Sequence, residues 1–124
     1  MGCGVACVAY ILKTGYNHAK KVFVHPEYAC SRGYYCKEIC EALKSKKKEY
    51  GYSRYGSKKK ALLNIDGTIV FIGNSKQYPA GHFLVKAEKG WMNPWINFPL
   101  IIPAKSGFQK NLPGKAQWIL YQKS

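Results

Sequence analysis

The chain has 124 residues, of which 47% are hydrophobic and 15% are aromatic. This composition excludes a disordered chain, and the length is typical of one domain with its own core, so we expect a single globular domain over residues 1–124. The 20 Lys and Arg residues against 6 Asp and Glu residues give a formal charge of +14, which favours anionic partners such as RNA, anionic lipid or an acidic protein. No apolar run approaches the roughly 20 residues needed to span a bilayer, so we expect no membrane span and a soluble chain.

The cysteines do not form a metal-binding pattern. Cys36 and Cys40 are spaced i, i+4 as on one face of a helix, unlike the C-x-x-C spacing of zinc sites. We therefore predict no metal site, and the chemistry considered below needs no cofactor. Cys30, Cys36 and Cys40 either hold a disulfide in an oxidising compartment or act as small buried hydrophobic residues, and we favour a reduced interior with at least one reactive thiol.

Three helices are expected in the first half of the chain. Apolar residues at helical spacing predict a helix over Cys3–Lys13, which Gly15 ends. A shorter helix is expected over Asn17–Val24, with Asn17 as its N-cap and an end imposed by the proline at position 26. The third helix begins at position 34 or 35 and ends near position 46, with lysines in its last turn.

The second half of the chain is expected to form a sheet. The segment Ser45–Lys60 lacks periodicity and contains two glycines, so we predict a loop or an irregular hairpin there. Short runs rich in large apolar residues predict strands at Thr68–Ile72, His82–Ala87 and Gln117–Tyr121. Helices followed by antiparallel strands indicate an α+β domain whose helices pack on one face of the sheet.

A basic segment with interleaved tyrosines follows the third predicted helix. Such a segment binds single-stranded nucleic acid or an acidic partner through charge and stacking, yet the same composition is also typical of a solvated loop. The candidate binding residues are the cations of this segment, namely Lys46, Lys47, Lys48, Arg54, Lys58, Lys59 and Lys60.

Cys3 is the candidate nucleophile. It lies between two glycines at the start of the first predicted helix, where unsatisfied backbone N–H groups and the helix dipole favour a thiolate. The same N–H groups, including that of Gly4, point at the space in front of the sulfur and are suited to stabilise an oxyanion. The alternative is that Cys3 is one more small residue near a frayed terminus.

His82 and Asn93 are the candidate partners of this thiol. His82 opens an apolar strand, a rigid position that suits a general base. A hairpin that turns near Lys89 and Gly90 would bring Asn93 back beside the histidine, where its amide would fix the imidazole tautomer. Taken separately, His82 is a hydrogen-bonded residue at a strand end, and Asn93 before a proline is a turn signal.

These motifs resemble those of a known enzyme family. Cys3-Gly4-Val5-Ala6-Cys7-Val8-Ala9 with Thr14-Gly15-Tyr16, then Gly81-His82-Phe83-Leu84-Val85 and Asn93-Pro94, are similar to the successive boxes of the bacteriocin-processing, C39-type cysteine peptidases, which cleave leader peptides after a double glycine. The resemblance implies a papain-like fold, a peptide or protein substrate, a Cys nucleophile and a His base. The family has Asp where this chain has Asn93, and a glutamine before the Cys that is absent here, so the oxyanion hole would use backbone donors alone or another side chain such as Gln77.

We therefore expect a cysteine-dependent hydrolase that attacks a peptide or amide bond by thiol acyl transfer, with Cys3, His82 and Asn93 as its triad. Two alternatives stay open. The first is a papain-fold toxin or effector domain, secreted or delivered by a bacterium, that acts on RNA or as a deamidase and is inhibited by an acidic immunity protein. The second is a non-catalytic basic domain that only binds its partner, and the presence of Cys3 argues against it.

Overall fold

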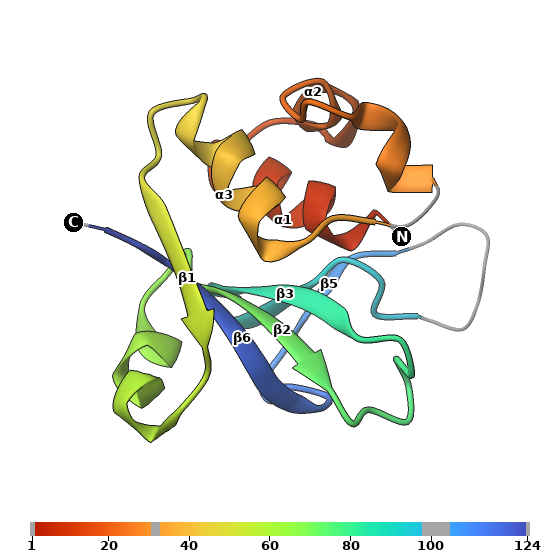
Figure 1. Cartoon of the computed structure of the whole chain (residues 1–124). Helices are drawn as coiled ribbons and strands as arrows, with labels where there is room; N and C mark the ends of the chain where they lie inside the picture. Colours follow the sequence, from red (N-terminus) through yellow and green to blue (C-terminus); the bar gives the residue numbers. More distant parts are fainter. Residues whose placement is uncertain (1, 31–32, 98–104, 124) are drawn as a thin grey trace.

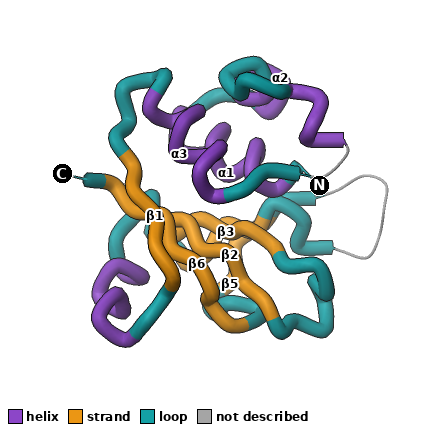
Figure 2. Tube along the Cα trace, viewed as in Figure 1, coloured by secondary structure: helices purple, strands orange, loops and turns teal. Residues whose placement is uncertain are grey.

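The computed structural model describes residues 2–30, 33–97 and 105–123. The three α-helices lie together on one side of a sheet (Figure 1), and Figure 2 shows these two layers coloured by secondary structure. The helices are α1 (Cys3–Leu12), α2 (Tyr16–Lys20) and α3 (Cys36–Lys44), with the 3-10 helices η1 (Pro26–Cys30) and η2 (Ser57–Asn64). The strands are β1 (Tyr50–Arg54), β2 (Ile69–Gly73), β3 (His82–Ala87), β4 (Gly90–Asn93), β5 (Gly107–Gln109) and β6 (Lys115–Gln122).

The sheet has the strand order β1-β6-β2-β3-β4-β5, and every neighbouring pair is antiparallel. This confirms the predicted α+β class and the antiparallel sheet. The three strands predicted from apolar runs are β2, β3 and β6, with bounds that differ by two residues at most. Among the described residues, no helix is long and apolar enough to cross a membrane.

The predicted helices are present, with corrected ends. α1 ends where Lys13 takes the left-handed conformation (φ 56°), before Gly15 is reached. Gly15 is instead the N-cap of α2, so the predicted helix over Asn17–Val24 was wrong in its cap and too long. The helix is shorter than predicted because the chain already turns after Lys20, before it reaches the proline at position 26. The third predicted helix is α3, which begins one or two residues later than expected.

The core that positions the site lies between the helices and the sheet. In β3, Phe83 and Val85 pack with apolar residues of α1 and α3, while Leu84 belongs to a second apolar cluster on the far face. This division follows from the alternation of side chains along a strand. The far face is covered partly by Leu62 and Leu63 of η2. As a result, β3 is fixed from both sides where it meets α1.

The segment Ser45–Lys60, predicted as a loop or irregular hairpin, contains an edge strand and the start of a 3-10 helix. β1 pairs in antiparallel register with β6. Tyr50 is buried, and its hydroxyl donates to the carbonyl of Gly67 at 2.7 Å. Lysines, glycines and polar residues are common on edge strands because one side of such a strand faces solvent. β1 has no apolar run for this reason, so the apolar pattern of the sequence did not predict it.

Candidate active site

Cys3 is the first residue of α1, at the end of the helix that approaches the start of β3. Its side chain is partly buried. The backbone amides of Phe83 and Gly4 donate toward its sulfur. The amide of Phe83 is the important one, because it belongs to the residue that follows His82 and therefore ties the thiol to the histidine-bearing strand.

A glycine with a required conformation precedes His82. Gly81 has φ +91°, and a Cβ at this position would lie 2.2 Å from the Cζ atom of Phe71. Both the backbone angle and the close ring exclude a side chain here. Gly81 therefore fixes the turn that brings His82 into the first position of β3.

His82 is almost completely buried, with 3% of its surface exposed. Its Nε2 atom lies 2.7 Å from Oδ1 of Asn93. The predicted juxtaposition of these two residues is therefore present, formed by the β3–β4 hairpin. Burial lowers the pKa of His82 to about 4, against a smaller opposing effect of the Asn93 hydrogen bond. The imidazole is consequently neutral near pH 7.

Four hydrogen bonds fix the orientation of the Asn93 amide, whose side chain is fully buried. Its Oδ1 accepts from the backbone N–H of Trp95 at 2.9 Å as well as from His82. Its Nδ2 donates to the hydroxyl of Tyr78 at 2.9 Å and to Oε1 of Gln109 at 2.7 Å. Because Trp95 N–H can only donate, the atom that it contacts must be the amide oxygen.

This network also fixes the tautomer of His82. An amide oxygen only accepts hydrogen bonds, so Nε2 of the neutral imidazole carries the proton that Asn93 receives. The other ring nitrogen, Nδ1, then has the lone pair. A neutral histidine with a defined acceptor nitrogen is what a general base requires.

Tyr78 completes the surroundings of the histidine, and the sequence analysis did not identify it. Its ring stacks on the His82 imidazole with centroids 3.9 Å apart and planes 4° apart. Its hydroxyl accepts from Asn93 and donates to the carbonyl of Trp95 at 2.5 Å. Burial raises the pKa of Tyr78, and the hydrogen bond from Asn93 offsets part of this rise. A lone tyrosine before Pro79 carried no sequence signal for this role.

Burial outweighs the effect of the helix terminus on the Cys3 thiol. Burial raises the pKa of Cys3, and the amides of Phe83 and Gly4 offset only part of this rise. The helix terminus was expected to favour a thiolate, and its amides do lower the pKa of Cys3, but burial has the larger effect and His82 is neutral. The resting pair is therefore an uncharged thiol and an uncharged imidazole.

The two candidate oxyanion residues differ in their surroundings. Gly4 is buried in α1, and a Cβ there would lie 3.1 Å from Cδ1 of Ile39, so glycine at this position serves the packing of α1 against α3. Its backbone amide faces Cys3. The side chain of Gln77 donates from Nε2 to the carbonyl of Ile96 at 3.1 Å, which anchors this amide beside the segment after β4.

The remaining cysteines include two free thiols on α3. Burial raises the pKa of Cys36 to about 11 and that of Cys40 to about 12. No disulfide joins these two residues in this structure. The side chain of Cys30 lies outside the described part of the molecule. Within the described residues, no three His, Cys, Asp or Glu side chains are grouped as metal ligands would be.

The seven predicted cationic residues do not form one patch. Lys46, Lys47 and Lys48 follow α3, and Lys58, Lys59 and Lys60 lie in η2 on the other side of β1. Arg54 ends β1, with its guanidinium carbon 5.6 Å from the centre of the Trp118 ring. Lys59 lies similarly over Tyr121, at 5.0 Å.

The buried neutral histidine predicts a pH-dependent stability. The folded-state pKa of His82, about 4, lies below the ordinary value of 6.5, so the unfolded chain binds this proton first as the pH falls. The stability that His82 contributes is complete above pH 6.5 and is lost progressively as the pH falls toward 4. Between about pH 7.5 and pH 5 we expect a loss of about 2 kcal/mol in the free energy of unfolding, measured with urea.

The same measurement on His82→Gln and His18→Gln identifies the source of this loss. We expect His82→Gln to remove about 2 kcal/mol of the pH dependence and His18→Gln, at an exposed position, to retain it. Equal pH dependence in the His82→Gln and wild-type proteins would contradict the assignment.

A scan against protein-family models and a search of curated proteins found no significant match to this chain. The function must therefore be argued from the site itself.

Proposed function

We propose that the protein is a cysteine-dependent hydrolase that cleaves a peptide or amide bond, with Cys3 as nucleophile, His82 as general base and Asn93 as the residue that orients the histidine. The observation that carries the proposal is the directed Asn93 network, which leaves Nδ1 of a buried neutral histidine as an acceptor. The backbone amide of Phe83, the residue after His82, donates toward the sulfur of Cys3 and brings the two elements together. The bonds to Tyr78, Gln109 and Trp95 hold the Asn93 amide so that its oxygen faces His82.

The reaction would begin from the uncharged pair. As Sγ of Cys3 bonds to the substrate carbonyl carbon, its proton passes to Nδ1 of His82, and the C=O electron pair moves to oxygen. The backbone amides of Cys3 and Gly4 at the start of α1 would donate to this oxyanion. The carbonyl then re-forms while the C–N bond breaks, and His82 gives its proton to the leaving nitrogen. Water, deprotonated by His82, hydrolyses the thioester and restores the thiol.

The arrangement also supports the finer part of the proposal, a papain-like domain of the C39 type. A thiol at a helix start, a histidine at the first position of a strand and an asparagine on the return strand follow the chain order of the motifs that resemble that family. The natural substrate would be a peptide or a protein. A side-chain amide is the alternative, because the same acyl transfer would then deamidate a glutamine or asparagine.

Acyl trapping tests the proposed chemistry. On mixing with p-nitrophenyl acetate we expect a burst of about one nitrophenolate per chain, and peptide mass spectrometry should place the acetyl group on Cys3. Cys36 is an internal control, since it is partly exposed but has a pKa of about 11. Acetylation of Cys36 at the same rate as Cys3, or no burst, would argue for the non-catalytic binding domain instead.

A further inference from the structure

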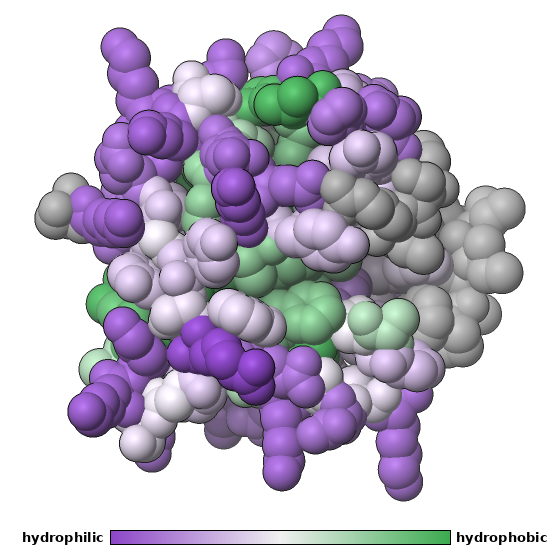
Figure 3. Space-filling model, viewed as in Figure 1, coloured by the Kyte–Doolittle hydropathy of each residue, from purple (hydrophilic) through white to green (hydrophobic). Residues whose placement is uncertain are grey.

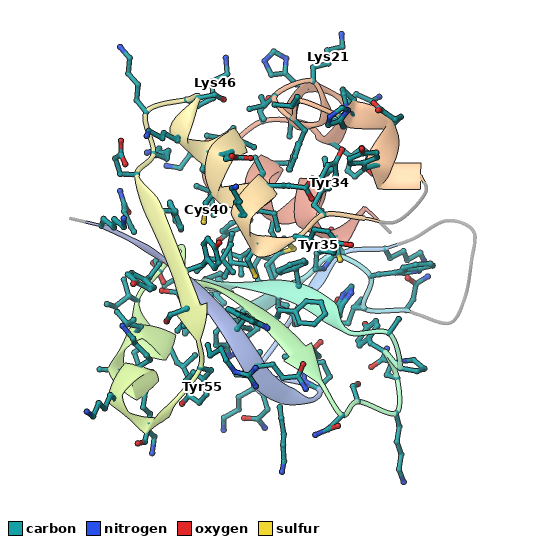
Figure 4. All side chains as sticks on the ribbon, viewed as in Figure 1. Lys21, Tyr34, Tyr35, Cys40, Lys46 and Tyr55 are labelled. Carbon is teal, nitrogen blue, oxygen red and sulfur yellow. The ribbon has the colours of Figure 1, made fainter. Side chains whose placement is uncertain are left out.

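An aromatic groove lies between the helical layer and the sheet. It encloses about 290 Å³, and six of its eight described lining residues are aromatic. Figure 3 shows apolar residues gathered in the middle of this face between hydrophilic margins, and Figure 4 shows Tyr35 where the chain enters α3, over the strands. The aromatic lining residues are Tyr34, Tyr35, Tyr52, Phe71, Phe83 and Trp118.

The groove continues into a second one along β1. The second groove encloses about 300 Å³ and shares Lys37 and Tyr52 with the first. It adds Tyr50 and Tyr121 to the aromatic lining. Because the two grooves meet at Lys37 and Tyr52, they form one elongated path, which suits an extended polymer better than a compact small molecule.

The charge along this path is mainly positive. Lys37 lines both grooves, and Lys123 lines the second, where Glu41 is the one acidic residue among the described lining residues. Arg54 adds a cation beside the first groove, because its guanidinium lies over the ring of Trp118. The rings at the opening are also accessible, since Tyr35 is 66% exposed and Tyr52 is 42% exposed.

We propose that the two grooves form one binding site for a single strand of nucleic acid. The bases would stack on Tyr35 and Tyr52, and the phosphates would lie beside Lys37 and Arg54. Stacking rings combined with cations along a groove are how sequence-tolerant single-strand binding is achieved. An apolar peptide would use the rings but not the cations, and an acidic peptide would use the cations without requiring flat rings.

Fluorescence anisotropy with a labelled oligouridine of about 12 nucleotides tests this site. We expect Tyr52→Leu, which keeps apolar bulk but removes the ring, to weaken binding at least about five-fold. Arg54→Ala should weaken binding and lower the slope of log K against log salt by about 0.7, the change expected for one lost phosphate contact. Both residues are exposed, and unchanged urea unfolding curves would show that the fold is retained.

Two matched controls keep the interpretation specific. Lys21→Ala removes one exposed charge from the end of α2, well away from the strands in Figure 4, and should leave the affinity within two-fold, about 0.4 kcal/mol. Equal weakening by Lys21→Ala, unchanged binding by Tyr52→Leu, or equal affinity for a polyglutamate peptide would overturn the proposal. Cys3→Ala should bind the oligouridine normally, so this result does not depend on the hydrolase chemistry.

Discussion

Replacing His82 with glutamine is expected to slow the acetylation of Cys3 about a thousandfold, because a positioned general base typically contributes between about a hundredfold and ten-thousandfold. This substitution removes the nitrogen that would accept the thiol proton in the proposed mechanism, while a side chain that hydrogen-bonds is kept beside Asn93. The thiol pKa is raised by burial, so few thiolates are present to react without a base. The rate of nitrophenolate release after mixing with the ester measures this effect.

Two further variants distinguish loss of the base from loss of the nucleophile and from a nonspecific effect of replacing a histidine. Cys3→Ala should abolish the burst, and His18→Gln should leave its rate unchanged. Acetylation of Cys3 in His82→Gln at the wild-type rate would show that the thiol reacts without this histidine. In that case Cys3 would be an ordinary nucleophile and the proposed triad would fail.

The Asn93→Leu substitution is expected to lower the free energy of unfolding by about 3–5 kcal/mol. Leucine has a similar size, so the loss would come from hydrogen bonds rather than from a cavity. The N–H groups of Trp95 and His82 both lose their acceptor, and each unsatisfied buried group costs about 1–3 kcal/mol. Urea denaturation monitored by circular dichroism gives the difference.

Asn64→Leu is the matched control for this substitution. Asn64 is exposed at the end of η2, and we expect its replacement to change stability by less than about 0.5 kcal/mol. A loss of under about 1 kcal/mol for Asn93→Leu would mean that water or a new tautomer satisfies the network. The amide would then not be the group that holds His82 in place.

The parts of the site that were predictable are local in sequence. His82 and Asn93 are joined by a short hairpin, so strand alternation and the glycine at position 90 were enough to bring them together. The position of Cys3 at a helix start followed in the same way from the apolar spacing after it. In each case one element and its turn determine where the side chain lies.

The rest of the site depends on packing between distant elements. Gln109 accepts a hydrogen bond from Asn93 and lies on β5, a three-residue strand that no apolar run predicts. Tyr78 has its role only because its ring meets His82 across a turn. The sign of the Cys3 pKa shift was missed for the same reason, since desolvation is set by what covers the sulfur and not by the helix that carries it.

The uncharged state of Cys3 and His82 has a consequence for how long the Cys3 thiol escapes oxidation. Peroxides and soft electrophiles attack thiolates far faster than thiols, so a sulfur that keeps its proton resists sulfenic acid formation. Under the proposed mechanism, the proton leaves Cys3 only while a carbonyl is bound in front of it. Burial at the start of α1 would therefore give a nucleophile that is latent toward oxidants between turnovers.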